Sequence, residues 1–234
     1  MREPLTIAVA QPACHLGDVS ANARAHATAI RAAGARLVVF PELSLTGYDL
    51  DAPVVRPDDP RLAPIVDACR ETGAAALAGA PVSGSTGLDS IGMLVVDGTG
   101  ARVAYRKMWL GTGETARFAA GPEPTVLEID GWRLGLAICR DAGVPQHWAD
   151  TAALGIDAYV AGSVKAVDEG DLQDERARRV AVEHGIWVAV ASGAGANGGG
   201  YEPAAGRSGI WAADGKVVAQ AGAEPGETVR ATLR

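Results

Sequence analysis

The chain has 234 residues, 48% of them apolar, so it is long enough to bury a continuous core, and we expect one domain spanning residues 1–234. Its formal net charge of −7, without a basic stripe, argues against a nucleic-acid partner. No stretch approaches the roughly 20 apolar residues of a membrane span, and the apolar run near the N-terminus is too short for a signal peptide. We therefore expect a cytoplasmic protein with no membrane partner.

The cysteines argue against a disulfide framework. Cys14, Cys69 and Cys139 are odd in number and far apart, so at least one thiol should be free. Cys69 falls on the apolar side of a predicted helix and should lie in the core. No Cys-x-x-Cys or His-x-x-x-His spacing offers metal ligands, and we predict neither a metal site nor an organic cofactor.

The beginning of the chain predicts a strand, a helix and a second strand. An apolar run at 5–10 is followed by an alanine-rich helix, which Asp18 or Ser20 caps and which Gly34 ends. The next apolar run lies at 36–40. This order is the βαβ pattern of two parallel strands.

Helices and strands continue to alternate along the rest of the chain, with hairpins between them, which indicates packed α/β layers. A charged helix at 171–184 should bury Leu172, Val180 and Val182, and the glycine-rich segment at 193–200 should be a mobile loop. The other predicted elements are helices at 61–72 and 144–154, strands at 74–82, 90–96, 102–106, 125–130, 132–138, 157–161, 187–191, 208–213, 216–221 and 228–233, and a turn at 83–89.

Three residues that can carry chemistry stand directly after or at the end of predicted strands. Glu42 follows the strand at 36–40, Lys107 closes a hairpin strand, and Cys139 ends the apolar run at 134–138. Strand ends are rigid positions where α/β proteins often bind ligands. Burial there would raise the pKa of Glu42 into the range useful for proton transfer. From position alone, each residue also has an ordinary interpretation, as a solvated loop acid, a surface lysine or a buried core thiol.

Short fragments surround these three positions along the whole chain. They are Ala10-Gln11, Phe40-Pro41-Glu42, Thr46-Gly47-Tyr48, Tyr105-Arg106-Lys107, Glu114 with Phe118 and Gly121, Gly135, and Ile138-Cys139 with Asp141 and Pro145. In this order they resemble the pattern of the nitrilase, or carbon–nitrogen hydrolase, superfamily, whose members carry a Glu-Lys-Cys triad at strand ends. The resemblance implies an α/β fold of the four-layer αββα sandwich type and a homodimer or higher homo-oligomer.

The resemblance also implies roles for residues of this sequence. Cys139 would be the nucleophile and Glu42 its base, while Lys107 and the backbone N–H of Arg140 would hold the oxyanion. Glu114 matches the family's second, positioning glutamate, which would orient the lysine or the substrate amine. Tyr48, beside Glu42, would help to enclose the substrate.

The implied function is hydrolysis of a small amide through a cysteine thioester, with release of ammonia. The same triad in the wider family also supports hydrolysis of nitriles or N-carbamoyl compounds, or acyl transfer. An alternative of a different class is a catalytically idle homologue with a structural or regulatory role.

Three positions depart from the family pattern, so the resemblance does not identify the acyl group of the substrate. Arg140 stands where many amidases have an aromatic residue, Gln146 where a glutamate is common, and Ser192 where an asparagine often follows the strand. We interpret the Arg140 side chain as structural rather than as a carboxylate-binding group. A Cys-His pair is not supported, and the histidines are predicted to be surface residues. They are His15, His26, His147 and His184.

Overall fold

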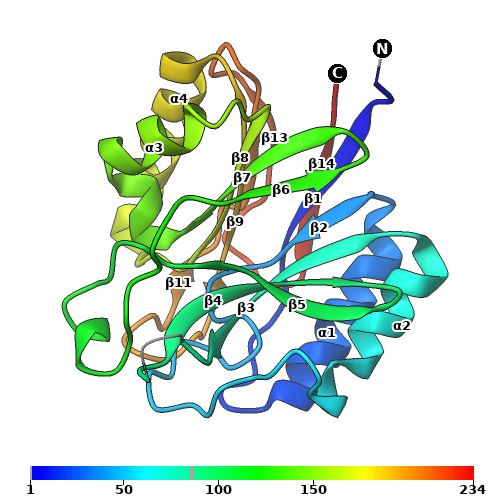
Figure 1. The fold of residues 1–234 in the computed structure, drawn as a ribbon, viewed down its shortest axis with the longest axis vertical. Helices are drawn as coiled ribbons and strands as arrows, with labels where there is room; N and C mark the ends of the chain where they lie inside the picture. Colours follow the sequence, from blue (N-terminus) through cyan, green and yellow to red (C-terminus); the bar gives the residue numbers. More distant parts are fainter. Residues whose placement is uncertain (1, 85–86) are drawn as a thin grey trace.

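The computed structural model describes residues 2–84 and 87–234, whose longer strands form two six-stranded sheets that face each other. Two helices cover the outer face of each sheet, which confirms the predicted αββα sandwich (Figure 1). The helices are α1 (Val19–Ala33) and α2 (Ala63–Thr72) on the first sheet, and α3 (Pro145–Ala152) and α4 (Gly170–His184) on the second.

Each sheet contains a parallel centre with antiparallel neighbours. The first sheet has the order β14 (Glu227–Leu233), β1 (Leu5–Gln11), β2 (Leu37–Val39), β3 (Ala75–Val82), β4 (Ser90–Asp97), β5 (Gly100–Arg106). The second has the order β13 (Val217–Gln220), β12 (Gly209–Trp211), β9 (Trp187–Ser192), β8 (Ala158–Ser163), β7 (Trp132–Ile138), β6 (Val126–Ile129). In the first sheet β1, β2 and β3 are parallel, and in the second β7, β8 and β9 are parallel.

Helix α1 begins and ends where its capping residues predict. The Asp18 side chain accepts a hydrogen bond of 2.9 Å from the backbone N–H of Ala21, so Asp18 rather than Ser20 is the N-cap. Gly34 follows the helix with a φ of +55°, a left-handed conformation that glycine adopts without steric cost. The chain can therefore turn back at once into β2.

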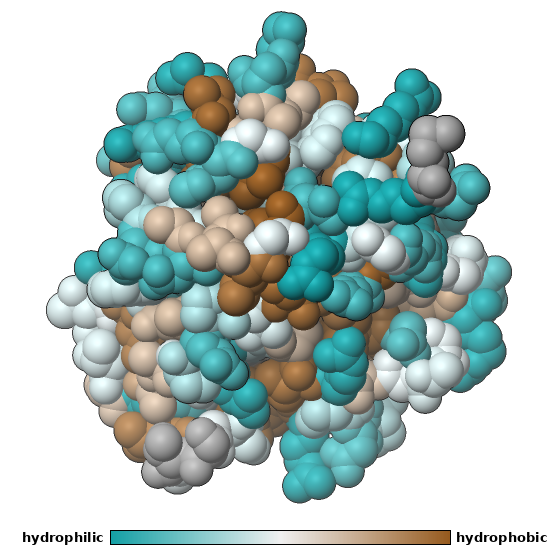
Figure 2. Space-filling view, turned by 45° about the horizontal axis from the view of Figure 1, so that its top comes forward, coloured by the Kyte–Doolittle hydropathy of each residue, from teal (hydrophilic) through white to brown (hydrophobic). Residues whose placement is uncertain are grey.

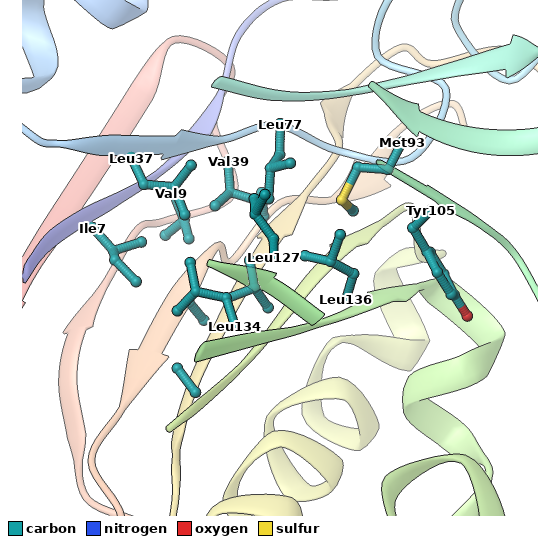
Figure 3. Packing of buried hydrophobic residues seen from close by; sticks show 14 of the residues in the cluster. Ile7, Val9, Leu37, Val39, Leu77, Met93, Tyr105, Leu127, Leu134 and Leu136 are labelled. Carbon is teal, nitrogen blue, oxygen red and sulfur yellow. The ribbon is translucent and has the colours of Figure 1, made fainter. Parts of the chain in front are cut away.

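The main core lies between the two sheets. Side chains alternate along each strand, so one set points to the opposite sheet and the other to the helices. Figure 3 shows this inner set, with Val9 and Val39 of the first sheet close to Leu134 and Leu136 of the second. Strand β2 is buried on both faces, as its continuous apolar run predicts.

Polar residues dominate the face drawn in Figure 2, where apolar side chains are visible mainly along a strip that runs down the middle of the view. Most of the large apolar side chains are packed between the sheets or under the helices, and the exposed ones include Leu16, Val167 and Val182. Within residues 2–84 and 87–234, no helix is both long and apolar enough to cross a membrane.

Helix α4 buries a different face from the predicted one. Val180 is buried, but Leu172 is 39% and Val182 is 54% exposed. The side of α4 that faces the sheet is formed by residues at helical spacing, and most of them are small or polar. The prediction instead chose the most hydrophobic residues of the helix. The buried residues are Gly170, Gln173, Ala177, Val180 and Ala181.

The glycine-rich segment at 193–200, predicted to be a mobile loop, contains strand β10 (Ala194–Gly195). It pairs with β11 (Ala204–Ala205), and Asn197 Nδ2 donates a hydrogen bond of 2.9 Å to the carbonyl of Ala194. Local sequence patterns do not reveal this pairing because the partner strand lies further along the chain. Of the predicted turn at 83–89, residues 85 and 86 lie outside the described residues.

Two histidines are buried, so their prediction as surface residues was wrong. His26 donates from Nδ1 to the carbonyl of Asn22 at 2.6 Å and accepts at Nε2 from the Ser44 hydroxyl at 2.9 Å. His147 is bonded at Nε2 to the Tyr105 hydroxyl and at Nδ1 to the Tyr159 hydroxyl. Asn22 lies one turn before His26 in the same helix, whereas Ser44, Tyr105 and Tyr159 come from other segments, and together they satisfy both nitrogens of each ring in its neutral form.

Acidification should destabilise the protein through His26. Burial lowers the pKa of His26 from 6.5 to about 4. The stability that depends on neutral His26 is therefore fully present above pH 6.5 and is lost as the pH falls towards 4. The shift corresponds to about 3 kcal/mol. In urea unfolding, the His26→Gln variant should lose less stability between pH 7 and pH 4 than the original chain.

The control for this experiment is His15→Gln, because His15 is exposed. Asp141 acts in the opposite direction, since burial raises its pKa to about 6, but all three proteins retain Asp141. Equal pH dependence of the His26→Gln variant and the original chain would contradict the prediction.

Candidate active site

The predicted catalytic residues Glu42, Lys107 and Cys139 come from strand ends of both sheets. Glu42 follows β2, and Lys107 follows β5, which runs parallel to β2 because two antiparallel pairings separate it from β3. Cys139 follows β7 of the opposite sheet. The carboxyl ends of these strands meet, and all three side chains are buried.

The backbone at Glu42 passes between two glycines, one in each sheet. A Cβ atom on Gly79 of β3 would lie 2.3 Å from the backbone nitrogen of Leu43, and one on Gly162 of β8 would lie 2.8 Å from the carbonyl oxygen of Phe40. Any larger residue at either position would displace this segment. The absence of side chains at the two glycines therefore leaves room for the segment that carries Glu42 between the sheets.

Lys107 is held between two carboxylates. Its Nζ donates hydrogen bonds to Glu42 Oε1 at 2.6 Å and to Glu114 Oε1 at 2.7 Å. The side chains are at most 2% exposed, so these are buried ion pairs rather than surface contacts. An ammonium group has three N–H donors, which leaves one for another acceptor.

The two carboxylates have opposite pKa shifts. Burial raises the pKa of Glu42, an effect that the charge of Glu114 reinforces and Lys107 only partly offsets. Glu114 is also buried, but Lys107, the Tyr48 hydroxyl and the N–H of Gly111 bond to its carboxylate and bring its pKa below the usual value. Such a pair commonly provides one proton acceptor and one permanent anion.

Glu42 has one oxygen available for proton transfer. Its Oε2 atom is buried and has no hydrogen-bond partner among the described residues. The Cys139 thiol lies close enough that Glu42 and Cys139 shift each other's pKa. Glu42 therefore has the position and the free acceptor that a base for this thiol requires.

Cys139 sits at a sharp bend between β7 and a short 3-10 turn, Cys139–Gly143. Its φ is +45°, which is uncommon for a residue other than glycine. The thiol donates to the carbonyl of Val164 at 3.4 Å. Burial and the charge of Glu42 raise its pKa, whereas Lys107 lowers it. The thiol is consequently protonated at rest and needs a base.

The remaining predicted site residues occupy different environments. The Tyr48 hydroxyl donates to Glu114 Oε1 at 2.5 Å, so Tyr48 supports the second glutamate. The Arg140 side chain is exposed, while its backbone N–H lies in the first turn after Cys139, where 3-10 helices leave donors free. Across the described parts of the chain, no cluster of three or more His, Cys, Asp or Glu could hold a metal ion.

A buried network behind Cys139 was not predicted. Asp141 accepts from the backbone N–H of Ile138 at 2.9 Å and of Trp109 at 2.8 Å, and from the Tyr105 hydroxyl at 2.8 Å. Asp141 thus ties the end of β7 to the loop that follows Lys107. The position of Asp141 directly after a strand was the sequence signal that could have indicated its role. Its hydrogen-bond partners become apparent only when the two sheets pack together.

The αββα sandwich places the protein in a structural class that includes nitrilase-superfamily proteins. More specifically, the chain belongs to the carbon–nitrogen hydrolase family, whose family model matches residues 6–234. A protein described as a hydrolase in the pqqF 5′ region of Pseudomonas protegens is 31% identical over 217 residues, which cover 88% of this chain and 74% of that protein.

Similar solved structures share the whole fold. Saccharomyces cerevisiae Nit3 has a TM-score of 0.87 at 24% identity, with 99% of this chain and 90% of Nit3 covered, which shows the fold alone. The amidase from Nesterenkonia sp. AN1 has a TM-score of 0.86 at 27% identity, with 98% and 90% covered. That structure is of a variant of the amidase, and in it the acetamide moiety of fluoroacetamide is covalently added at the active-site cysteine.

Proposed function

We propose that the protein hydrolyses a small amide through a thioester on Cys139 and releases ammonia. The observation that carries this proposal is the buried Oε2 of Glu42, which has no hydrogen-bond partner among the described residues and lies near the Cys139 thiol, with Lys107 held against the same carboxylate. The amidase from Nesterenkonia, whose structures include a complex with butyramide, supports an amide as the substrate class.

In the first half of the reaction, Glu42 Oε2 takes the thiol proton as the sulfur attacks the amide carbon. The carbonyl electron pair moves to oxygen, where the third N–H of Lys107 and the backbone N–H of Arg140 stabilise the charge. When the tetrahedral intermediate collapses, the carbon–nitrogen bond breaks. Glu42 returns its proton to the nitrogen, and ammonia leaves.

In the second half, a water molecule replaces ammonia. Glu42 takes a proton from this water, whose oxygen attacks the thioester carbon. The carbon–sulfur bond then breaks, and the proton returns to Cys139 as the carboxylic acid departs. Glu114 stays ionised and orients Lys107, because the Lys107 ammonium, the Tyr48 hydroxyl and the Gly111 N–H all donate to its carboxylate and lower its pKa.

Butyramide hydrolysis in the presence of hydroxylamine tests this proposal. Hydroxylamine attacks a thioester, so part of the product should become the hydroxamate while ammonia release continues. Ammonia release without any hydroxamate would argue against the thioester. Absence of ammonia from a panel of short amides, together with turnover of a nitrile, would argue against the amidase assignment. The homo-oligomer and the cytoplasmic location stay predictions.

A further inference from the structure

A buried histidine on α3 takes part in none of the steps of the proposed reaction. His147 is 1% exposed, and its ring nitrogens are bonded to two tyrosine hydroxyls. Nε2 lies 2.9 Å from the Tyr105 hydroxyl, and Nδ1 lies 2.8 Å from the Tyr159 hydroxyl. Burial lowers the pKa of His147 to about 4, so at pH 7 the ring is neutral and has one N–H donor and one acceptor nitrogen.

Asp141 determines which of the two nitrogens of His147 carries the proton. Burial raises the pKa of Asp141 to about 6, so at pH 7 its carboxylate is ionised and can only accept hydrogen bonds. The Tyr105 hydroxyl therefore donates to Asp141 Oδ2 at 2.8 Å, and its oxygen accepts from the Nε2–H of His147. Nδ1 then has no proton and accepts from the Tyr159 hydroxyl. Each hydroxyl and ring nitrogen of this chain of groups has a partner, as buried polar groups require.

The chain of hydrogen bonds ends at the bend that carries Cys139. Asp141 Oδ2 also accepts from the backbone N–H of Ile138 at 2.9 Å, so one carboxylate joins the residues before and after the bend. Cys139 has a φ of +45°, a conformation that costs free energy and persists only where neighbouring contacts enforce it. The backbone N–H of Arg140 belongs to the same bend. The hydrogen bonds of Asp141 therefore affect where both the thiol and this N–H point.

The same carboxylate is tied to the chain on both sides of Lys107. Tyr105 lies two residues before Lys107, at the end of β5 in the first sheet. The backbone N–H of Trp109, two residues after Lys107, donates to the other oxygen of Asp141 at 2.8 Å. The distance between the lysine of the first sheet and the bend of the second thus depends on Tyr105 and Asp141.

We propose that His147 is a positioning residue for the reaction at Cys139. Its Nε2–H donates to Tyr105 and keeps the hydroxyl of Tyr105 directed at Asp141, which holds the bend in place relative to Lys107. The effect of the imidazole is indirect, because it reaches the bend only through these two side chains. This inference rests on the proposed amidase function and adds a residue that acts through Tyr105.

Two single variants and their combination test whether His147 acts through Tyr105. In His147→Leu and in Tyr105→Phe, kcat for butyramide should fall by roughly 10- to 100-fold with little change in KM, because the reacting groups lose their alignment. The double variant should be no slower than Tyr105→Phe, since His147 has no link to the bend without the Tyr105 hydroxyl. Losses that multiply in the double variant would overturn the inference.

His147→Asn and His147→Gln form a matched pair of variants. The shorter asparagine amide occupies the Nδ1 side of the ring and can reach Tyr159, whereas the glutamine amide extends to the Nε2 side and can donate to Tyr105. The asparagine variant should therefore lose kcat as His147→Leu does, and the glutamine variant should keep most of it. This pair also keeps the inference testable if His147→Leu fails to fold. Equal kcat values for the pair would overturn it.

Thr151→Val is the control for a general disturbance of α3. Thr151 is buried one turn after His147, and its hydroxyl donates to the backbone carbonyl of His147 at 2.6 Å. This variant should lower the midpoint of urea unfolding but leave kcat unchanged. A loss of kcat as large as that of His147→Leu would mean that any weakening of α3 slows the reaction, which would overturn the role of the imidazole.

Alkylation of Cys139 by iodoacetamide separates this inference from the proposed function because it does not require turnover. Its rate, followed on the Cys139 peptide by mass spectrometry, should fall by roughly tenfold in His147→Leu and stay unchanged in Thr151→Val. Slower alkylation of His147→Leu, combined with no hydrolysis of any amide by the original chain, would contradict the proposed function but retain the positioning role. Equal alkylation rates in His147→Leu and the original chain would overturn that role and leave the amidase function intact.

Discussion

Replacing Cys139 with alanine is expected to reduce ammonia release from short amides by roughly 10⁴-fold or more. The thiol is the nucleophile in the proposed reaction, and no other thiol lies beside the Glu42 carboxylate in the described structure. The measurement is kcat/KM for butyramide with purified protein. Cys14→Ala provides the control because Cys14 is a half-buried free thiol that takes no part in the proposed reaction, and this variant should keep full activity.

Glu42→Gln separates loss of the base from loss of the nucleophile. This variant keeps the thiol and an oxygen for Lys107, but its activity should fall by roughly 10²- to 10⁴-fold because no carboxylate accepts the thiol proton. In the original chain, activity should decline as the pH falls through the raised pKa of Glu42, and the variant should lack this acid limb. Undiminished ammonia release from Cys139→Ala or Glu42→Gln would contradict the mechanism.

Replacing Lys107 with methionine is expected to impair both stability and catalysis. It leaves Glu42 and Glu114 buried without their common cation, which should lower the free energy of unfolding by about 3–5 kcal/mol. Loss of an oxyanion donor should lower kcat by roughly 10²- to 10³-fold in the molecules that remain folded. Urea unfolding and kcat for butyramide measure the two effects.

A double variant keeps this prediction testable if Lys107→Met alone fails to fold. Adding Glu42→Gln removes one of the two stranded charges and should recover part of the lost stability without recovering activity. Lys216→Met, at an exposed ion pair with Asp214, should leave the unfolding midpoint unchanged. Unaltered stability of Lys107→Met would show that the buried ion pairs have little influence on folding.

The strand ends explain why Glu42, Lys107 and Cys139 could be selected from the sequence. Each follows or closes an apolar or alternating run whose end is easy to locate, and the order of the motifs resembles one family. Gln173, which is buried on α4, gave no such signal. It lies on a charged helix, where a glutamine is an ordinary surface residue unless the packing of that helix is known.

Helix α4 and the histidines also show what local sequence patterns do not predict, which is the side of a residue or helix that becomes buried. The prediction for α4 followed the most hydrophobic residues, but the sheet beneath it accepts Ala177 and Ala181 and leaves Val182 in solvent. His26 is buried because Asn22 and Ser44 satisfy its two nitrogens. The hydrogen bond to Ser44 joins α1 to a segment beyond β2, and local patterns do not contain such a contact.

The sequence by itself determined the alternation of helices and strands and the three strand ends that carry Glu42, Lys107 and Cys139, whereas the αββα class followed from the resemblance of its motifs to one family. Periodicity and capping are local properties, so residues close together in the chain are sufficient to predict them. Only the tertiary structure decided that Lys107 lies between two carboxylates and that Glu42 keeps, among the described residues, an oxygen without a partner beside the Cys139 thiol. These features depend on side chains from both sheets, which meet only after the layers have packed.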